Sequence, residues 1–384
     1  MRCCIVGAGL SGAVLARECA LAGHNVTMVD ERHHLAGNCH TSRDDKTGIM
    51  LHVYGPHIFH TDNREVWDYV AQFAEMVPYI NRVKAVSKGQ VYSLPINLHT
   101  INQFFGMAMS PSEAKAFISA RERAGSAEPK NFEEQGVSLL GEELYKAFFH
   151  GYTKKQWGVE PTDLPASILK RLPVRFNYDD NYFKHKFQGM PKEGYTEIVR
   201  RILDVDGIEV RLSTRFEDVK ESIDCDHVFY TGPIDRYFDY RLGQLAYRTL
   251  DFEKFYAEGD YQGNAVINYC DEEVPYTRIT EHKHFAPWEL ARFEQTVCYR
   301  EYSRECGKED IPYYPIRLAG EKALLSRYVE MAKSERGVTF VGRLGTYRYL
   351  DMDVTIAEAL DVARKSLEIV AADGSIPAFF IDPV

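Results

Sequence analysis

Two short apolar runs separated by a helix-like segment open the chain. Cys3 to Val6 and Val26 to Val29 have the length and composition of buried strands, and the residues from about Ser11 to Ala22 have helical spacing. A strand, a helix and a second strand in this order predict a βαβ unit with parallel strands. The chain is therefore expected to start as an α/β protein.

Further along, the pattern changes several times between helical and alternating spacing. Helical spacing recurs at residues 62–73, across 99–150 with breaks at Ser110-Pro111, 124–130 and Leu140-Gly141, near 320–333, and at 354–369. Strand-like stretches are 82–94, which reads as a hairpin about Lys88-Gly89, and 207–212, 227–231, 265–269, 276–280, 296–299 and 338–341. This alternation predicts domains that are interleaved along the chain.

The turn after the first strand carries the pattern Gly7-x-Gly9-x-x-Gly12. Gly7 permits a sharp turn, Gly9 permits close backbone approach to a pyrophosphate, and Gly12 lets the helix pack on the strand. The free N–H groups of the helix N-terminus attract the anion. Asp30 ends the second strand, where a carboxylate accepts hydrogen bonds from an unphosphorylated ribose. This segment predicts a dinucleotide site.

A second nucleotide-binding pattern lies near the other end of the chain. Gly342-Arg343 follows an apolar strand, and Asp351 and Asp353 precede the final helix. Glycine allows close approach of a ligand, arginine neutralises a phosphate or polarises a ring carbonyl, and aspartates cap helix N–H groups. An ordinary strand, turn and capped helix has the same pattern. Combined with the first site, it favours FAD, whose length requires contacts from distant parts of one fold.

We therefore predict a mixed α/β fold, in which a Rossmann-like FAD-binding domain carries a helical insertion and an antiparallel β-sheet domain. The expected segments are 1–78, 189–234 and 318–384 for the FAD-binding domain, 79–96, 181–188 and 235–317 for the β-sheet domain, and 97–180 for the helical domain with a mobile loop. Thr231-Gly232-Pro233 is expected as a tight turn at the carboxyl edge of the parallel sheet, where cofactors bind in such folds.

Charge and cysteine content narrow the class of protein. With 56 acidic and 46 basic residues the net charge is −10, so we expect no nucleic-acid partner, and an anionic substrate needs local arginines. No stretch approaches the roughly 18 apolar residues of a membrane span. Eight cysteines without a CxxC pair favour reduced thiols in the cytoplasm. His282 and His284 resemble a metal pair, but without a nearby cysteine or carboxylate set we interpret them as strand histidines and predict no metal site.

The middle of the chain is unusually rich in aromatic and basic residues. These are Tyr152, Lys154, Lys155, Gln156, Trp157, Lys170, Arg171, Arg175, Tyr178, Tyr182 and Phe183. A flat nucleobase needs an aromatic platform and a diphosphate needs arginine forks. Gly151-Tyr152 is expected to end a helix, and Leu164 to Pro173 to form a loop that closes over a ligand. An interdomain surface has the same composition, so this segment alone leaves both interpretations open.

Along nearly its whole length the chain resembles the prokaryotic UDP-galactopyranose mutases. The segments that carry the resemblance occur in order at residues 7–12, 54–61, 151–158, 170–176, 181–183, 230–235, 263–268, 275–279, 312–315 and 342–352. Two positions depart from the family's common pattern. Ala36 precedes Gly37-Asn38 where a second glycine is usual, and Leu350 stands where a tyrosine is frequent. Neither change removes a charged group.

The resemblance implies an isomerase that interconverts UDP-galactopyranose and UDP-galactofuranose without net redox change, for galactofuranose-containing surface glycans. It implies that FAD acts in its reduced form, with the flavin N5 attacking the anomeric carbon as UDP leaves. It further implies a cellular reductant such as NAD(P)H, a homodimer, and a cytoplasmic protein with no nucleic-acid or membrane partner.

The resemblance also assigns roles to individual residues. The expected catalytic residues are Arg171 on the mobile loop, Arg278 at the sheet and His60 beside the flavin ring. The expected substrate-binding residues are Tyr152, which stacks on uracil, Trp157, which closes the pocket, and Arg171, Tyr182, Phe183, Arg248, Asn268, Arg278, Glu301, Tyr314 and Tyr349. The expected cofactor-binding residues are Gly7, Gly9, Leu10, Ser11, Gly12, Asp30, Glu31, Gly37, Asn38, His57, Ile58, His60, Arg343, Tyr349, Asp351 and Met352.

Three alternatives stay open at this stage. A mutase that also or mainly uses UDP-N-acetylgalactosamine would share all of these segments. An FAD-dependent amine or alcohol oxidase would share both terminal patterns but would not need the arginines and tyrosines expected at a diphosphate. A UDP-sugar binding protein without activity would keep the uracil platform and fail to turn over.

Overall fold

The computed structural model describes residues 1–121, 128–171 and 174–384 of the chain. Its central element is a parallel sheet of five strands in the order β10, β2, β1, β11, β17. These strands are β1 (Arg2–Val6), β2 (Asn25–Val29), β10 (Ile208–Arg211), β11 (His227–Tyr230) and β17 (Val338–Phe340). They come from the start, the middle and the end of the chain. The expected βαβ unit at the N-terminus is confirmed.

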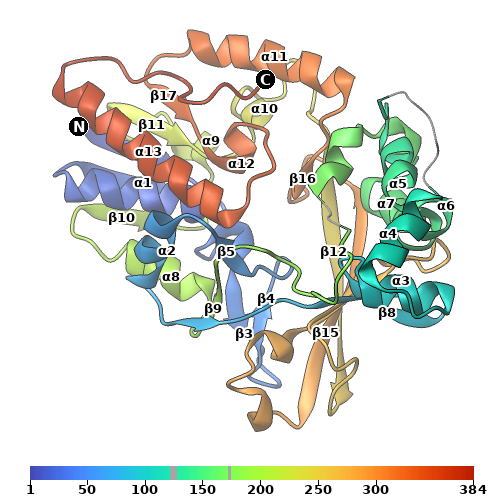
Figure 1. The fold of residues 1–384 in the computed structure, drawn as a ribbon. Helices are drawn as coiled ribbons and strands as arrows, with labels where there is room; N and C mark the ends of the chain where they lie inside the picture. The colour runs from blue at the N-terminus through green and yellow to red at the C-terminus, as the bar shows by residue number, and fades with distance from the viewer. Residues whose placement is uncertain (122–127, 172–173) are drawn as a thin grey trace.

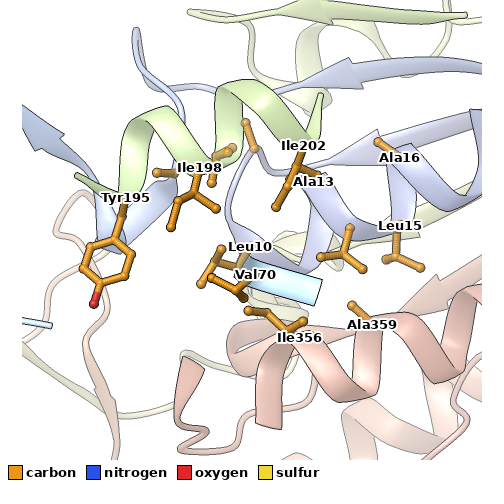
Figure 2. Close-up of a cluster of buried hydrophobic side chains, with 14 of the residues drawn as sticks. Leu10, Ala13, Leu15, Ala16, Val70, Tyr195, Ile198, Ile202, Ile356 and Ala359 are labelled. Carbon is orange, nitrogen blue, oxygen red and sulfur yellow. The ribbon is translucent and has the colours of Figure 1, made fainter. Parts of the chain in front are cut away.

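Helices cover both faces of this sheet. One face carries α1 (Leu10–Leu21), α2 (Arg64–Ala71), α8 (Tyr195–Ile202) and α13 (Met352–Ala371), and the other carries α9 (Phe216–Val219), α10 (Ile234–Tyr237), α11 (Ala319–Ser334) and α12 (Gly342–Gly345). Figure 2 shows the core of the first face, where Leu10 of α1, Ile198 of α8 and Ile356 of α13 converge with Val70 of α2. The first and last long helices thus pack in one domain.

The second large element is a seven-stranded sheet in the order β16, β12, β15, β14, β13, β7, β8. Its strands are β7 (Val83–Ser87), β8 (Gln90–Leu94), β12 (Tyr247–Glu258), β13 (Val266–Tyr269), β14 (Arg278–Glu281), β15 (Gln295–Glu305) and β16 (Tyr314–Pro315). Neighbouring strands are antiparallel except β13 and β7, which are parallel. The fold class predicted from the sequence is confirmed. The sheet was expected to be antiparallel throughout, and it differs only in the parallel pairing of β13 with β7.

Smaller elements join the two large sheets. They are a three-stranded sheet of β5 (Phe59–Thr61), β9 (Phe187–Pro191) and β6 (Met76–Pro78), a two-stranded sheet of β3 (Thr41–Arg43) and β4 (Met50–His52), and the single 3₁₀ turns η1 (Gly37–Cys39), η5 (His282–Phe285) and η6 (Leu290–Arg292). Within the described residues, no helix is long and apolar enough to cross a membrane.

The helical insertion lies on the side of the molecule opposite the parallel sheet (Figure 1). It contains α3 (Leu98–Phe105), α4 (Pro111–Ser119), α5 (Phe132–Leu140), α6 (Glu142–Tyr145), the π-helical turn η2 (Lys146–His150), α7 (Gly151–Trp157), and the 3₁₀ segments η3 (Pro161–Asp163) and η4 (Ala166–Arg171). Two local expectations are wrong. The helix does not end at Gly151 but continues through it to Trp157, and most of the expected loop from Leu164 is 3₁₀ helix.

Candidate active site

Three backbone segments meet at the carboxyl edge of the parallel sheet, in contacts that only glycine permits. A Cβ on Gly12 would lie 1.9 Å from the carbonyl oxygen of Gly7, and a Cβ on Gly7 would lie 2.1 Å from Thr231 Oγ1. Gly342, with φ of +78°, would place a Cβ 2.7 Å from Ser11 Oγ. The two glycine patterns at the ends of the chain therefore build one turn cluster, with the Thr231 turn between them.

A cavity of about 460 Å³ opens from this cluster. The N-cap of α1 is Gly9, which has no side chain to cap the helix, so the first N–H groups of α1 stay available for an anion. Most expected cofactor-binding residues line the cavity: Gly7, Gly9, Leu10, Ser11, Asp30, Glu31, Gly37, Asn38, His57, Ile58, His60, Arg343, Tyr349, Asp351 and Met352. Gly12 is buried behind them. A dinucleotide fits this lining, since it offers an anion site and two glycine backbones at once.

Two acidic residues that follow β2 and line the cavity already have partners within the protein. Asp30 accepts hydrogen bonds from the backbone N–H groups of Ala8 at 2.7 Å and Arg32 at 2.8 Å. Glu31 forms a two-point ion pair with Arg236, at 2.9 and 2.8 Å. A carboxylate has about four acceptor positions, so Asp30 retains capacity for a ribose hydroxyl while it ties the glycine turn to the end of β2.

At the opposite end of the cavity lie Arg343 and two histidines. Arg343 donates to the carbonyl of Tyr313 at 2.8 Å, and its guanidinium lies 5.0 Å from the ring centre of Tyr349. Burial, together with the charge of Arg343, lowers the pKa of His57 to about 4, so its ring is neutral near pH 7. Burial also lowers the pKa of His60. This end of the cavity combines one fixed positive charge with neutral imidazoles.

A second, smaller cavity of about 160 Å³ adjoins the first. Its lining is mainly apolar and aromatic, and includes Phe148, Phe149 and the expected Trp157. Three expected residues line both cavities: Tyr152, Tyr182 and Asn268. The Oδ1 atom of Asn268 is buried without a hydrogen-bond partner in the described structure, which leaves an acceptor for a ligand donor. Such a space suits a flat ring with a few polar atoms.

Arg278, which lines the large cavity and whose side chain is 22% exposed, carries a charge beside Tyr152 at the boundary between the two cavities. Arg278 Nε lies 3.2 Å from Glu301 Oε1, and its Nη2 donates to the Tyr152 hydroxyl at 2.9 Å. Burial raises the pKa of Tyr152 to about 12 and also raises the pKa of Glu301. Although burial opposes its charge, the neighbouring Glu301 keeps the pKa of Arg278 well above its usual value. Arg278 is thus a permanent cation at the place where both cavities meet, and Tyr314 lines the first cavity nearby.

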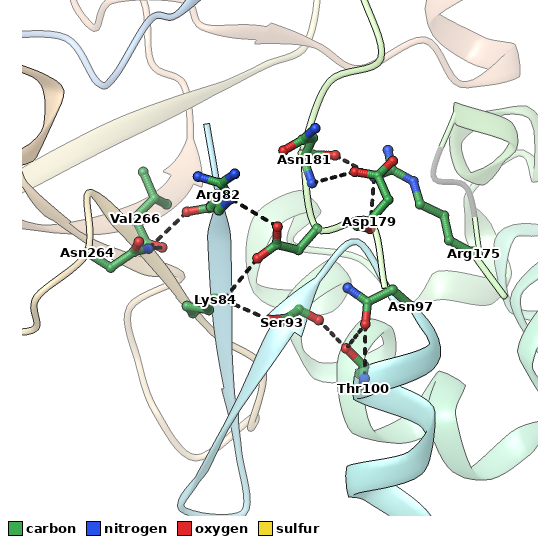
Figure 3. Close-up of polar contacts among 11 residues, drawn as sticks. Arg82, Lys84, Ser93, Asn97, Thr100, Arg175, Asp179, Asn181, Asn264 and Val266 are labelled. Carbon is green, nitrogen blue, oxygen red and sulfur yellow. Dashed lines mark hydrogen bonds and ion pairs between the residues drawn. The ribbon is translucent and has the colours of Figure 1, made fainter. Parts of the chain in front are cut away.

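The segment that brings Tyr182 and Phe183 to the cavity is fixed by charged contacts (Figure 3). Arg175 is 5% exposed, donates to the carbonyls of Asp179 and Asn181 at 3.1 and 2.6 Å, and pairs with the Asp179 carboxylate at 2.9 Å. Arg175, which the sequence suggested as a ligand-binding arginine of a loop, is therefore a structural residue. Phe183 stacks on His60 with ring centres 3.6 Å apart.

Two expected substrate residues are not placed in the cavities. Arg248 is buried outside the lining of both, where its Nε lies 3.1 Å from both the Gln156 carbonyl and Ser303 Oγ. Arg171 ends η4, and its side chain lies outside the described part of the structure.

Comparison with known proteins decides the family. A family model described as UDP-galactopyranose mutase matches residues 147–349, and one described as an NAD(P)-binding Rossmann-like domain matches residues 5–73. The chain is 61% identical over 377 residues to a probable UDP-galactopyranose mutase of Klebsiella pneumoniae, covering 98% of this chain and 97% of the relative. The chain belongs to the UDP-galactopyranose mutase family. The family predicted from the sequence and the isomerase class are confirmed, and an oxidase is not favoured.

Two further comparisons refine this assignment. The chain is 54% identical over 366 residues to the dTDP-fucopyranose mutase of Escherichia coli, covering 94% of this chain and 97% of the relative. A crystal structure of a reduced UDP-galactopyranose mutase matches with a TM-score of 0.73 at 16% identity, covering 97% and 96% of the two chains. The structural match shows that the family fold is present along the whole chain, and the Rossmann-like match confirms the expected dinucleotide-binding domain.

Sequence reasoning missed some residues that line the large cavity in this family member. Asn81 is 3% exposed, and its Oδ1 atom has no partner among the described residues. The Thr214 to Phe216 segment and Arg236 also contribute to the lining. A lone asparagine between two strands and an ordinary short loop after β10 give no pattern in the sequence that predicts this lining.

The interpretation of His282 and His284 as strand histidines is wrong. Both lie on the 3₁₀ turn η5, just after β14, because the chain turns sharply there. Carboxylates are also closer than expected: the side chains of Asp260, Glu281 and His284 offer ligand atoms within 4.8 Å of one another. Lys283 pairs with Asp260 at 2.7 Å, and Glu281 accepts three backbone N–H groups. These contacts explain the cluster as an anchor for the preceding loop.

Proposed function

We propose that this protein interconverts UDP-galactopyranose and UDP-galactofuranose, with FAD in the large cavity and the substrate's uridine in the small one. The observation that carries the proposal is the junction of the two cavities. Tyr152, Tyr182 and Asn268 line both, and Arg278 stands where they meet. A nucleotide sugar that spans the junction would place its diphosphate beside this partly buried arginine and its sugar in the cavity of the cofactor.

The residues present fit a flavin dinucleotide. The helix N-terminus at Gly9 and the adjacent Gly37 backbone suit its pyrophosphate, and Arg343 suits the polar edge of its ring. Reduced flavin supplies a nucleophilic nitrogen, which explains an isomerisation that needs electrons without consuming them. The residues around it have the simpler tasks of binding, orientation and charge stabilisation.

Each task can be assigned to described groups. Arg278 stabilises the negative charge that develops on the diphosphate as the anomeric bond breaks, and it cannot lose its proton at neutral pH. Tyr152 offers a face for stacking on uracil in the small cavity. Neutral His57 and His60 leave the ring end of the cavity without extra positive charge that would disfavour a cationic sugar.

The direct test is turnover under controlled redox conditions. Purified protein is expected to be yellow from noncovalent FAD, and anaerobic reduction followed by UDP-galactofuranose should yield UDP-galactopyranose on chromatography. Oxidised protein should bind UDP without turnover. Equal activity in aerobic buffer without reductant would contradict the mechanism, and a colourless protein that FAD cannot reconstitute would contradict the cofactor.

The 54% identity to a dTDP-fucopyranose mutase favours a second candidate substrate. Stacking in the small cavity accepts thymine as well as uracil, because both rings are flat and similarly polar. The same assay with dTDP-fucopyranose and UDP-N-acetylgalactosamine therefore decides the substrate by the ratio of kcat/KM values. We further propose a cytoplasmic homodimer that receives electrons from NAD(P)H, which sedimentation and reduction kinetics test separately.

A further inference from the structure

Helix α7 is attached to the seven-stranded sheet by a lysine with no role in the chemistry described above. The Lys155 ammonium donates to backbone carbonyls in the connection between β13 and β14. The four acceptors are the carbonyls of Tyr269 and Asp271 at 2.8 Å each, Val274 at 2.9 Å and Tyr276 at 3.1 Å. An ammonium has three protons, so these carbonyls share all of its donor capacity.

The neighbouring lysine has a different environment. The Lys154 side chain is 37% exposed, and it pairs with Glu160 at 2.8 Å and Glu272 at 2.7 Å. Lys155 is partly buried, and that burial lowers its pKa to about 8. Desolvation of the Lys155 cation costs free energy, and the converging carbonyl acceptors offset that cost only if the ammonium keeps a defined position. The surface ion pairs of Lys154 contribute little to stability.

The same β13–β14 connection also contacts α7 one turn earlier. A Cβ on Gly151 would lie 2.5 Å from the Cys270 carbonyl oxygen and 3.0 Å from the Glu272 nitrogen. Gly151 and Lys155 are four residues apart and share one face of the helix. The helix therefore contacts the connection by close backbone packing at Gly151 and by the charged clamp of Lys155, in addition to the Lys154–Glu272 ion pair at the surface.

Tyr152, which lies between these two points in the chain, reaches across to the sheet. Its hydroxyl accepts from Arg278 Nη2 at 2.9 Å, and Arg278 begins β14, immediately after the clamped connection. Asn268 lies on β13, immediately before that connection. The position of the connection against α7 therefore sets how Tyr152 is placed relative to Arg278 and Asn268.

We propose that Lys155 is a positioning residue for the nucleotide site. Its ammonium holds the β13–β14 connection against α7, so that the aromatic face of Tyr152 and the guanidinium of Arg278 are aligned before the nucleotide binds. This inference rests on the proposed function for the nature of the ligand. It predicts that loss of the ammonium weakens nucleotide binding without loss of the cofactor, which lies against other elements.

The test compares Lys155→Met with the matched control Lys154→Met. Calorimetry with UDP, and with dTDP as a second probe, gives Kd, while the visible absorbance of the purified protein gives FAD occupancy. We expect Lys155→Met to raise the Kd by about tenfold, which corresponds to about 1.4 kcal/mol, the order of one misplaced hydrogen-bonded contact. FAD occupancy should not change, and KM should rise more than kcat falls. Lys154→Met should match the wild type throughout.

A double-variant cycle with Tyr152→Phe separates alignment from general destabilisation. If Lys155 acts through the Tyr152–Arg278 contact, the two losses in UDP affinity combine to less than their sum. Additive losses, or a Kd for Lys155→Met equal to that of Lys154→Met, would overturn the inference. Should Lys155→Met not fold, Lys155→Gln keeps amide donors for the carbonyls and should show an intermediate Kd. Wild-type protein that binds neither nucleotide would instead refute the proposed function.

Discussion

Replacement of Arg278 by methionine removes the positive charge at the boundary between the two cavities. If Arg278 binds the diphosphate, the loss of a charge-assisted contact in the transition state costs about 2 to 4 kcal/mol, or about 30- to 900-fold in kcat/KM. The same substitution leaves Glu301, which is 1% exposed, without its cationic partner. Because the Arg278 side chain is 22% exposed, breaking this pair costs at most about 3 to 5 kcal/mol of stability, the cost of breaking a fully buried pair. Low activity alone would therefore not distinguish catalysis from folding.

A set of four proteins separates the two effects: wild type, Arg278→Met, Glu301→Gln and the double variant. Removal of both charges leaves no unpaired ion, so the double variant should regain most of the stability that Arg278→Met loses. Its kcat/KM should stay at the level of Arg278→Met, because the diphosphate still lacks its arginine. Thermal unfolding and initial rates with fixed FAD occupancy measure the two quantities.

The pH dependence of Arg278→Met gives an independent check. Burial already raises the pKa of Glu301, and removal of the nearby cation raises it further. A carboxyl group whose pKa is higher in the folded state than in the unfolded state lowers stability progressively as the pH rises from its unfolded-state pKa to its folded-state pKa. Arg278→Met should therefore become more stable as the pH falls from 7 towards about 5, relative to the double variant. If the double variant regained turnover, the role of Arg278 would be only to neutralise Glu301, and the proposed diphosphate contact would be refuted.

Other predictions address the cofactor, stability and the small cavity. Gly9→Val should fold, because the nearest protein atom to a Cβ at this position is 4.0 Å away, but it should lose FAD because the side chain would occupy the space that we assign to the cofactor. Gly12→Ala should fail to fold. A yellow Gly9→Val protein would contradict this prediction. Burial opposes the charge of Asp44, but hydrogen bonds from Lys254 and Thr47 lower its pKa to about 2. This shift stabilises the folded protein by about 2 kcal/mol above pH 4, and that contribution is lost as the pH falls to 2. Acid unfolding of Asp44→Asn should lack this component. UDP-induced changes in tryptophan fluorescence should disappear in Trp157→Phe and persist in Trp67→Phe.

The cofactor end of the site was predictable because its constraints are local. Gly12 packs on the carbonyl oxygen of Gly7, and Gly7 itself has φ of +104°, so both positions demand glycine within one turn and one helix even before Thr231 packs against Gly7. The spacing of Gly7, Gly9 and Gly12 is therefore enough to predict the turn and the start of the helix at this end of the site. The contact between Gly342 and Ser11 joins opposite ends of the chain. The sequence indicated this contact only indirectly, because both glycine patterns suggested FAD and a cofactor of that length needs contacts from distant parts of the fold.

The resemblance named the residues expected to bind substrate, and the structure brings most of them together, but physical reasoning from the sequence alone did not predict that they meet. Arg278 and Glu301 are neighbours because β14 pairs with β15 in the register that places these two residues opposite each other. The sequence of neither segment predicts that register. The expected end of the helix at Gly151 was wrong for a related reason. Glycine usually signals a break, but here the missing Cβ lets α7 pack on the Cys270 carbonyl, a tertiary contact that overrides the local preference.

The interleaving of the chain has a physical consequence for the order in which the site can form. The large cavity needs β1 and β11 to be neighbours, and its Gly342 wall needs β17 beside β11. The small cavity is lined by the helical insertion, the end of β8 with Pro95 and Ile96, Tyr182 and the β13 region, and contacts such as those of Lys155 hold the insertion against β13 and β14. Because Tyr152 and Arg278 serve the junction of both, the nucleotide site is complete only when the clamp on α7 and the parallel sheet are both in place. We therefore expect substitutions near the two ends of the chain to change cofactor retention, and substitutions in the middle to change nucleotide affinity.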